Sequence, residues 1–152
     1  MSFTKKGSCL CGEITYQIKD KPLFIHACHC TTCQKITGTS YWLSMFVLEH
    51  DFEILTGKPE IVYPPQQYGV AAKHYCGKCG CNIYGTHTYL ANLVLPATGT
   101  FEDTSWFEPQ AHIFTRSKQP WVQIPKDIPS FEKFYDRNAV WPKDSLDRLA
   151  AI

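Results

Sequence analysis

The sequence has almost no net charge and lacks long apolar runs. Its 15 Lys and Arg residues against 14 Asp and Glu leave a formal charge of +1, and its densest basic stretch is the pair Lys5 and Lys6. This balance provides no extended positive field for nucleic acid or an anionic membrane, so we expect neither partner. No segment approaches the roughly 20 apolar residues that span a bilayer. Residues 1–16 also lack the apolar stretch of a secretory signal, and we therefore expect a cytoplasmic location.

The composition is that of a folded protein. Hydrophobic residues make up 44% of the chain and charged residues only 19%, which is typical of a globular and not of a disordered sequence. An aromatic content of 14% and 10 prolines favour strands and extended loops over helices. At 152 residues the chain is long enough for a hydrophobic core and has the size of one domain. Because no linker or repeat interrupts it, we expect a single domain over residues 1–152.

Eight cysteines fall into three tight groups that lie far apart in the sequence. The groups are Cys9 and Cys11; Cys28, Cys30 and Cys33; and Cys76, Cys79 and Cys81. Clustered thiols in a reducing compartment bind metal more often than they bind each other. The even count also permits a disulfide framework, but that is typical of small secreted chains, and cysteines one residue apart are poor partners. The sequence therefore predicts a zinc protein, with enough thiolates for two tetrahedral sites.

Short strands between turn residues dominate the predicted secondary structure. Apolar and polar residues alternate over 13–19, which indicates a half-buried strand. Residues 52–55 and 61–63 flank the turn residues 56–59, and we expect them to pair as a hairpin. The expected strands are 13–19, 23–27, 41–48 (a central strand), 52–55, 61–63, 89–95, 111–115 and 121–124, with a helical turn at 31–38 and a short helix from Pro142. These elements indicate a mainly β fold of eight to ten short, mostly antiparallel strands folded over two metals.

The spacing of the cysteines suggests how they divide between two sites. A structural zinc site is usually closed by four protein ligands, whereas a catalytic site leaves one position open. Cys76 and Cys79, flanked by glycines, form half of a zinc ribbon, and the pair Cys9 and Cys11 complements them. This pairing leaves the group at 28–33 with three ligands. The spacing by itself leaves a swapped assignment open.

Three cysteine-bearing phrases carry a resemblance to a known family. They are GSCLCGEITY, HACHCTTCQKITGTSY and YCGKCGCNIYG, followed by LVLPATGTFED and HIFTRSKQPWV. In this order they resemble the glutathione-dependent formaldehyde-activating enzyme family, which includes the centromere protein V-type domains, over roughly residues 5–135. The resemblance implies several small, coiled antiparallel sheets organised around zinc. It also implies a structural zinc on Cys9, Cys11, Cys76 and Cys79, and a second zinc, associated with glutathione, on Cys28, Cys30 and Cys33.

Cys81 departs from the family pattern, in which a small residue such as Ser or Thr is more typical. One interpretation makes Cys81 the fourth ligand of the second zinc, which would close that site and weaken a catalytic role. The other makes it a buried free cysteine that acts as a small apolar side chain. The sequence leaves both open.

The polar residues near the second group have two interpretations. Thr31, Thr32, Gln34 and Lys35 line a peptide-binding cleft or are ordinary solvated side chains. We expect the side chain of His29 to point away from the metal, and we assign no catalytic role to a histidine. A hydrogen bond from His29 or His74 to a thiolate remains an alternative.

The leading hypothesis is an enzyme. It is a zinc-dependent carbon–sulfur lyase that forms or cleaves S-hydroxymethylglutathione or a related adduct, with glutathione or another small thiol as partner and Cys28, Cys30 and Cys33 acting through zinc. The alternative is a non-enzymatic zinc module that binds a protein or a small thiol. Thiol redox chemistry at Cys76 and Cys79 is disfavoured, because redox C-x-x-C motifs belong to a βαβ context.

Overall fold

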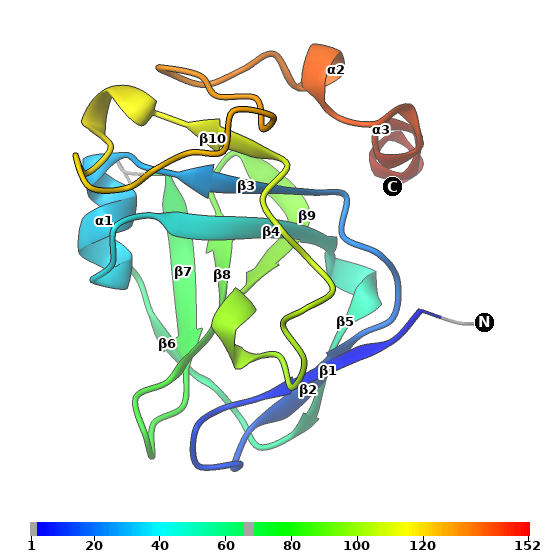
Figure 1. Cartoon of the computed structure of the whole chain (residues 1–152). Helices are drawn as coiled ribbons and strands as arrows, with labels where there is room; N and C mark the ends of the chain where they lie inside the picture. Colours follow the sequence, from blue (N-terminus) through cyan, green and yellow to red (C-terminus); the bar gives the residue numbers. More distant parts are fainter. Residues whose placement is uncertain (1–2, 66–68) are drawn as a thin grey trace.

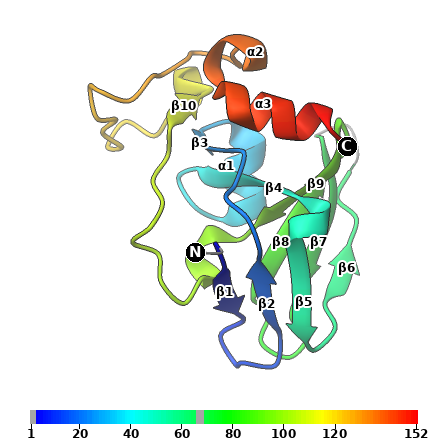
Figure 2. The ribbon, with the colours of Figure 1, turned by 90° about the vertical axis from the view of Figure 1, so that its right-hand side faces the viewer.

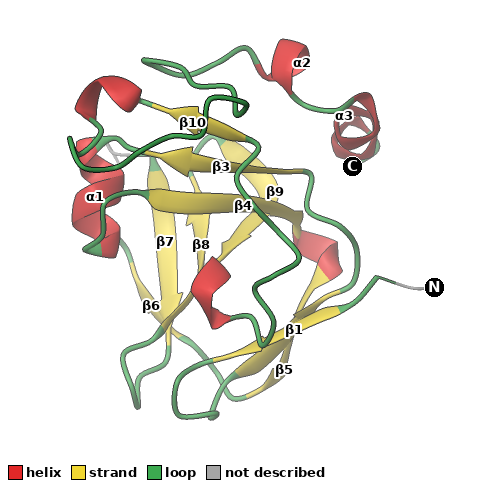
Figure 3. Cartoon of the chain, viewed as in Figure 1, coloured by secondary structure: helices red, strands yellow, loops and turns green. Residues whose placement is uncertain are grey.

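The computed structural model describes residues 3–65 and 69–152, and within them the chain forms ten strands in two sheets (Figures 1 and 3). This confirms the predicted mainly β fold. Residues 1 and 2, at the start of the segment expected to carry no secretory signal, lie outside the described residues. The smaller sheet has the order β1-β2-β5 and is antiparallel throughout. Its strands are β1 (Lys5–Ser8), β2 (Thr15–Ile18) and β5 (Phe52–Thr56).

The larger sheet has seven strands in the order β10-β3-β4-β9-β8-β7-β6. All its pairs are antiparallel except β10 with β3, which is parallel. A parallel pair needs a long crossover, and the chain between β3 and β10 runs from 29 to 110 and includes β4 to β9. The strands are β3 (Phe24–Cys28), β4 (Trp42–Leu48), β6 (Glu60–Val62), β7 (Val70–Tyr75), β8 (Asn82–His87), β9 (Leu90–Pro96) and β10 (Ala111–Ile113).

The helices are short and lie at the ends of the sheet. The predicted helical turn is α1 (Thr31–Thr37), which Gly38 ends in the left-handed conformation, as expected. The predicted C-terminal helix is α3 (Lys143–Ala150), and the shorter α2 (Arg137–Val140) precedes it. Figure 2 shows α3 on the side of the larger sheet where β3 begins. Among the described residues, no helix combines the length and apolar character that crossing a membrane requires.

Two hydrophobic clusters fill the interior, and each contains buried cysteine sulfur. The first includes Cys28 and packs β3, β4 and β9 against the C-terminal segment. The second lies between the two sheets and includes Cys9 and Cys76. The alternation predicted for β2 is confirmed, because Tyr16 and Ile18 are fully buried while their neighbours are partly exposed. Each cysteine group therefore has at least one residue buried in one of the two hydrophobic clusters.

The predicted hairpin over 52–63 is wrong. β5 pairs with β2 in the smaller sheet, whereas β6 pairs with β7 in the larger one. Gly57 does adopt a turn conformation, with a φ of 72°, but there the chain passes from one sheet to the other. The predicted turn is therefore present, but the predicted pairing of the two strands is not. Strand pairing depends on contacts between residues distant in the sequence.

The strand predicted over 121–124 is also absent. The backbone N–H of Val122 donates to the carbonyl of Gln119 at 3.1 Å, which forms a turn. The ammonium group of Lys118 donates to the same Gln119 carbonyl and to the Val122 carbonyl, at 3.1 and 2.6 Å. With these carbonyls satisfied by a local lysine, the segment needs no partner strand.

We expect Gly57→Ala to destabilise the fold more than Gly38→Ala. Both glycines have positive φ, which costs an alanine roughly 1–2 kcal/mol. A Cβ at Gly57 would lie 2.5 Å from the Glu13 carbonyl oxygen and 2.9 Å from Ile14 Cγ1, whereas a Cβ at Gly38 meets nothing within 4 Å. The clash should therefore add roughly 1–3 kcal/mol at Gly57 alone. Urea unfolding of both variants measures the difference, and equal losses would show that the crossing at Gly57 can relax freely.

Candidate metal centres and thiol site

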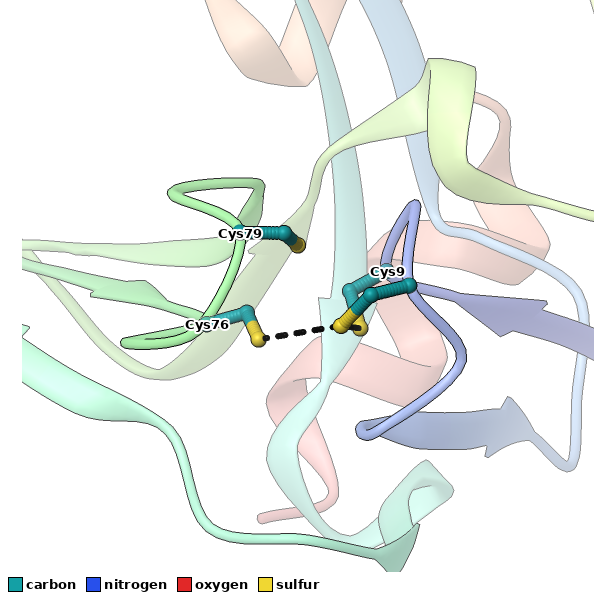
Figure 4. A group of neighbouring side chains, drawn as sticks. Cys9, Cys76 and Cys79 are labelled. Atoms are coloured by element: carbon teal, nitrogen blue, oxygen red, sulfur yellow. Dashed lines mark hydrogen bonds between the residues drawn. The ribbon is translucent and has the colours of Figure 1, made fainter.

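The first cysteine group joins the two sheets. Cys9 and Cys11 lie in the loop after β1, and Cys76 and Cys79 lie in the loop after β7. Figure 4 shows Cys9 projecting from one loop toward Cys76 and Cys79 on the other. The four Sγ atoms lie within 4.8 Å of one another, with 3.5 Å between Cys9 and Cys11 and 3.8 Å between Cys11 and Cys76. Tetrahedral zinc, with Zn–S bonds of about 2.3 Å, places its sulfurs roughly 3.8 Å apart, so this donor set fits a four-coordinate ion.

Tight turns bring these sulfurs together. In the first loop, the N–H of Gly12 donates to the Cys9 carbonyl at 3.0 Å, and the N–H of Ile14 donates to Cys9 Sγ at 3.2 Å. In the second loop, the N–H of Gly80 donates to the Cys76 carbonyl at 2.8 Å. Gly12 and Gly80 both have positive φ, which turns of this kind require. The glycines beside the cysteines thus set the shape of both loops.

The peptide groups around the first group favour thiolate. Backbone N–H groups of Cys81 and Cys11 donate to the sulfur of Cys79 and lower its pKa to about 6. Cys9 and Cys76 are almost fully buried, at 2% and 1% exposure, while Cys11 is exposed. A metal held here would therefore be anchored in the core between the two sheets and reached from solvent on the side of Cys11 and the partly exposed Cys79.

The second group is formed within a single short segment. Cys28 ends β3, Cys30 is the N-cap of α1, and Cys33 lies in the first turn of that helix. Their three Sγ atoms lie within 4.8 Å of one another. The N–H of Cys33 donates to Cys30 Sγ at 3.3 Å, so the sulfur takes the place of the usual capping oxygen. The cap and the strand end thus set the geometry of the group.

The three thiols have different acidities. Hydrogen bonds from the thiols of Cys28 and Cys33, together with backbone N–H groups of Cys33 and Thr32, hold the pKa of Cys30 well below its usual value. Hydrogen bonding to Cys30 raises the pKa of Cys28, and the same contacts with Cys28 and Cys30 raise the pKa of Cys33. The backbone N–H groups directed at Cys30 thus favour its thiolate, which is the form that binds metal.

The second group is reachable from outside the protein on one side. Cys28 is buried at 5% exposure, whereas Cys30 and Cys33 are partly exposed. A groove of about 400 Å³ runs beside α1. Its lining residues are Thr31, Thr32, Lys35, Ile36, Pro64 and Pro65. Three of the four polar residues expected to line a cleft, Thr31, Thr32 and Lys35, line this groove, and Gln34 does not.

Cys81 lies outside both groups. Its sulfur packs against the cluster that contains Cys9 and Cys76, and its thiol donates to the carbonyl of Asn82 at 3.7 Å. Burial raises the pKa of the Cys81 thiol, although the N–H of Leu10 donates to it. Among the described residues, the second group therefore contains three sulfurs and not four. The interpretation of Cys81 as a free cysteine that packs as a small apolar side chain fits this position, although the residue is partly exposed and not buried.

The histidines make contacts away from the sulfurs. The Nε2 atom of His29 lies 2.9 Å from Nδ1 of His112, and the ring of His74 stacks on Tyr84 at 3.9 Å. The side chain of His29 therefore points away from the cysteines on either side of it, as expected. Sequence reasoning missed Ser117, whose hydroxyl donates to the His29 carbonyl from far along the chain. No spacing rule could have found a contact across 88 positions.

The comparisons with known proteins agree with this geometry. The structure is similar to the crystal structure of a Rhodobacter sphaeroides protein, with a TM-score of 0.52 and 14% identity, covering 68% of this chain and 91% of that one. This likeness concerns the fold alone. The sequence model of the glutathione-dependent formaldehyde-activating enzyme matches residues 4–117, which include all eight cysteines and both groups described above. The chain therefore belongs to the glutathione-dependent formaldehyde-activating enzyme family.

Proposed function

We propose that this protein is a zinc-dependent carbon–sulfur lyase that forms or cleaves S-hydroxymethylglutathione or a related thiol adduct. The observation that carries the proposal is the second group, in which three sulfurs gather and two of them are partly exposed. Three protein ligands with one open position are typical of a reactive zinc site, whereas four are typical of a structural one. Membership of a glutathione-dependent family supports a small thiol as the substrate.

In this proposal the two groups have different roles. Cys9, Cys11, Cys76 and Cys79 hold a structural zinc, and Cys28, Cys30 and Cys33 hold the second zinc, beside which the chemistry occurs. Zinc bound there supplies Lewis acidity and lowers the pKa of an arriving thiol. Thiolate ligands on both ions suit a reducing compartment such as the cytoplasm.

The reaction is an addition and involves no net oxidation. The thiol sulfur forms a bond to the carbon of formaldehyde, and the thiol proton ends on the former carbonyl oxygen; cleavage reverses both changes. Thiols add to formaldehyde quickly without help, so the required acceleration is modest. The task left to the chain is mainly to hold and orient the thiol.

The groove beside α1 suits the remainder of a peptide thiol. Lys35 provides an ammonium group, and Thr31 and Thr32 provide hydroxyl groups along the same wall. Such groups bind carboxylates, and the glycine and γ-glutamyl ends of glutathione both carry one. Because the helix that presents these residues also carries Cys33, a thiol at the second group would have its carboxylates within reach of the groove.

The test is the rate of glutathione and formaldehyde exchange, measured by magnetisation transfer in NMR. With zinc-loaded protein, we expect the rate to rise in proportion to protein concentration. Cys33→Ser should reduce the protein-dependent part at least tenfold, because it removes one of three sulfurs. Cys81→Ser is the matched control, since it makes the same chemical change outside both groups, and it should keep the wild-type rate. A rate independent of wild-type protein at all concentrations would end the proposal.

One observation favours the alternative of a non-enzymatic zinc module. Cys28 is 5% exposed and belongs to the first hydrophobic cluster, so a metal there could serve mainly to stabilise the fold. Substitution of Cys28 or Cys33 distinguishes the two functions. A folded but inactive Cys33→Ser supports catalysis, whereas unfolding of both variants, together with no protein-dependent exchange in the wild type, supports the structural module.

A further inference from the structure

The peptide between two sulfurs of the second group is held by contacts from three directions. The carbonyl of His29 accepts hydrogen bonds from Nε2 of Gln34 at 2.8 Å and from Oγ of Ser117 at 2.9 Å. The N–H of His29 donates to the carbonyl of Ile113 in β10 at 3.0 Å. The ring of His29 is fully buried against His112. Because this residue separates Cys28 from Cys30, its position decides how those two sulfurs face each other.

Gln34 uses every hydrogen-bonding atom of its side-chain amide. Its two N–H hydrogens go to the carbonyls of His29 and Ser117, the latter at 2.9 Å, and its oxygen accepts from Nε2 of Gln119 at 2.7 Å. A primary amide offers two donors and one acceptor oxygen, so this one is fully engaged. Such networks rigidify the groups that they join.

The amide therefore connects α1 to the end of β3 and to a segment that lies far away in the sequence. Gln34 belongs to α1 next to Cys33, the His29 carbonyl lies where β3 gives way to that helix, and Ser117 ends the 3₁₀ helix η4 (Thr115–Ser117). Sulfur ligands must keep their separation to within a few tenths of an ångström for tight binding. Without Gln34, the peptide at His29 and the first turn of α1 would be held to each other mainly by backbone contacts.

We infer that Gln34 is a positioning residue for metal at the second cysteine group. Its amide fixes the His29 peptide between Cys28 and Cys30 relative to Cys33 and ties all three to the segment at Ser117 and Gln119. The inference rests on the proposed function, because it requires that the second group binds a metal ion. It adds to that function a reason why residues more than 80 positions away should control the affinity of this ion.

The experiment measures zinc stoichiometry and the dissociation constant of each ion by competition with a chromophoric chelator. Gln34→Met keeps the length of the side chain and removes all three hydrogen bonds. Gln34→Glu keeps the shape but places a carboxylate oxygen against two carbonyl oxygens. Both should raise the dissociation constant of the second ion by roughly 10–100-fold and leave the first ion unchanged, as is usual when a group that orients metal ligands is lost. Cobalt substitution should show the same selectivity as weakened sulfur-to-cobalt charge-transfer absorption from one site.

Gln17→Met is the matched control. Gln17 is also half-buried, and its Nε2 donates to Glu53 at 2.8 Å in the smaller sheet, away from both cysteine groups. It should bind both ions as the wild type does. Gln119→Leu removes only the hydrogen bond to the Gln34 oxygen, so it should raise the dissociation constant of the second ion by a smaller factor. If the Gln34 variants do not fold, this variant decides the test.

The outcomes are separable. If the wild-type protein binds one ion per chain and not two, the proposed function itself is wrong. Wild-type protein that binds two ions, with Gln34→Met and Gln34→Glu binding both equally well, would overturn the role of Gln34 alone. Equal weakening of both ions would also overturn it, because a general loss of stability does not distinguish between sites.

Discussion

Replacing Cys76 by serine is expected to remove the first metal and unfold a large fraction of the protein. Cys76 is 1% exposed in the cluster between the sheets, and its sulfur lies 3.8 Å from that of Cys11 on the opposite loop. Serine is a poor zinc ligand, and structural zinc contributes its binding energy to folding. We expect the free energy of unfolding to fall by more than about 4 kcal/mol, as in the few single substitutions that destroy a metal site. Domains of this size are stable by about 5–15 kcal/mol, so this loss takes most of the margin.

The measurement is metal content per chain together with guanidinium unfolding followed by far-UV circular dichroism. Cys81→Ser is the control, because Cys81 lies on the same hairpin yet outside both groups. It should retain the metal content of the wild type and lose no more than about 1 kcal/mol. Cys76→Ser protein with wild-type metal content and an unchanged midpoint would show that the first group is not a structural metal site.

Truncating Trp141 to alanine is expected to cost about 3–5 kcal/mol, the usual range for a buried tryptophan. The Trp141 ring stacks on Phe24 at 5.4 Å and packs on Phe46 at 5.3 Å, and it is only 6% exposed. Its Nε1–H donates to the hydroxyl of Tyr135 at 2.7 Å, and that hydroxyl lies 2.9 Å from Nδ1 of His26. The substitution therefore opens a cavity against β3 and breaks a buried hydrogen-bond network.

Trp121→Ala is the matched control, because it removes the same side chain from a site that is 70% exposed. It should change the free energy of unfolding by no more than about 0.5 kcal/mol. Both variants lose a fluorophore, so circular dichroism must follow unfolding. Equal effects from the two truncations would mean that the C-terminal segment is not part of the cooperative core. Trp141 lies beyond the family match, which ends at residue 117.

The C-terminal helix was predicted from local signals. The way it packs on the rest of the protein depends on contacts with distant residues. The helix follows Pro142, and Leu146 and Leu149 pack against the first cluster, whereas Ala150 is exposed. The Oγ of Ser145 donates to the carbonyl of Leu23 at 2.6 Å, a contact across 122 positions. Local signals could predict where the helix begins, and periodicity could predict which leucines face the core. Neither could predict that the helix covers the start of β3.

The two cysteine groups were predicted from different kinds of signal, one local and one not. Cys28, Cys30 and Cys33 are so close along the chain that a strand end and one helical turn bring their sulfurs together. The two halves of the first group lie 65 positions apart between Cys11 and Cys76, so their meeting was inferred from complementary pairs and a family resemblance. The place of Cys81 stayed open, because sequence spacing allowed it either to be the fourth ligand of the second group or to be a buried free cysteine.

The sequence by itself determined the local chemistry of this protein: clustered thiols suited to metal, alternating strands, and glycines at the turns. Each of these depends on neighbours within a few residues, where backbone geometry limits the choices. Only the tertiary structure decided that β5 and β6 belong to different sheets, that β10 runs parallel to β3, and that Gln34 meets Ser117 and Gln119. These pairings depend on contacts between distant segments, and many arrangements of the same local elements would satisfy the same sequence pattern.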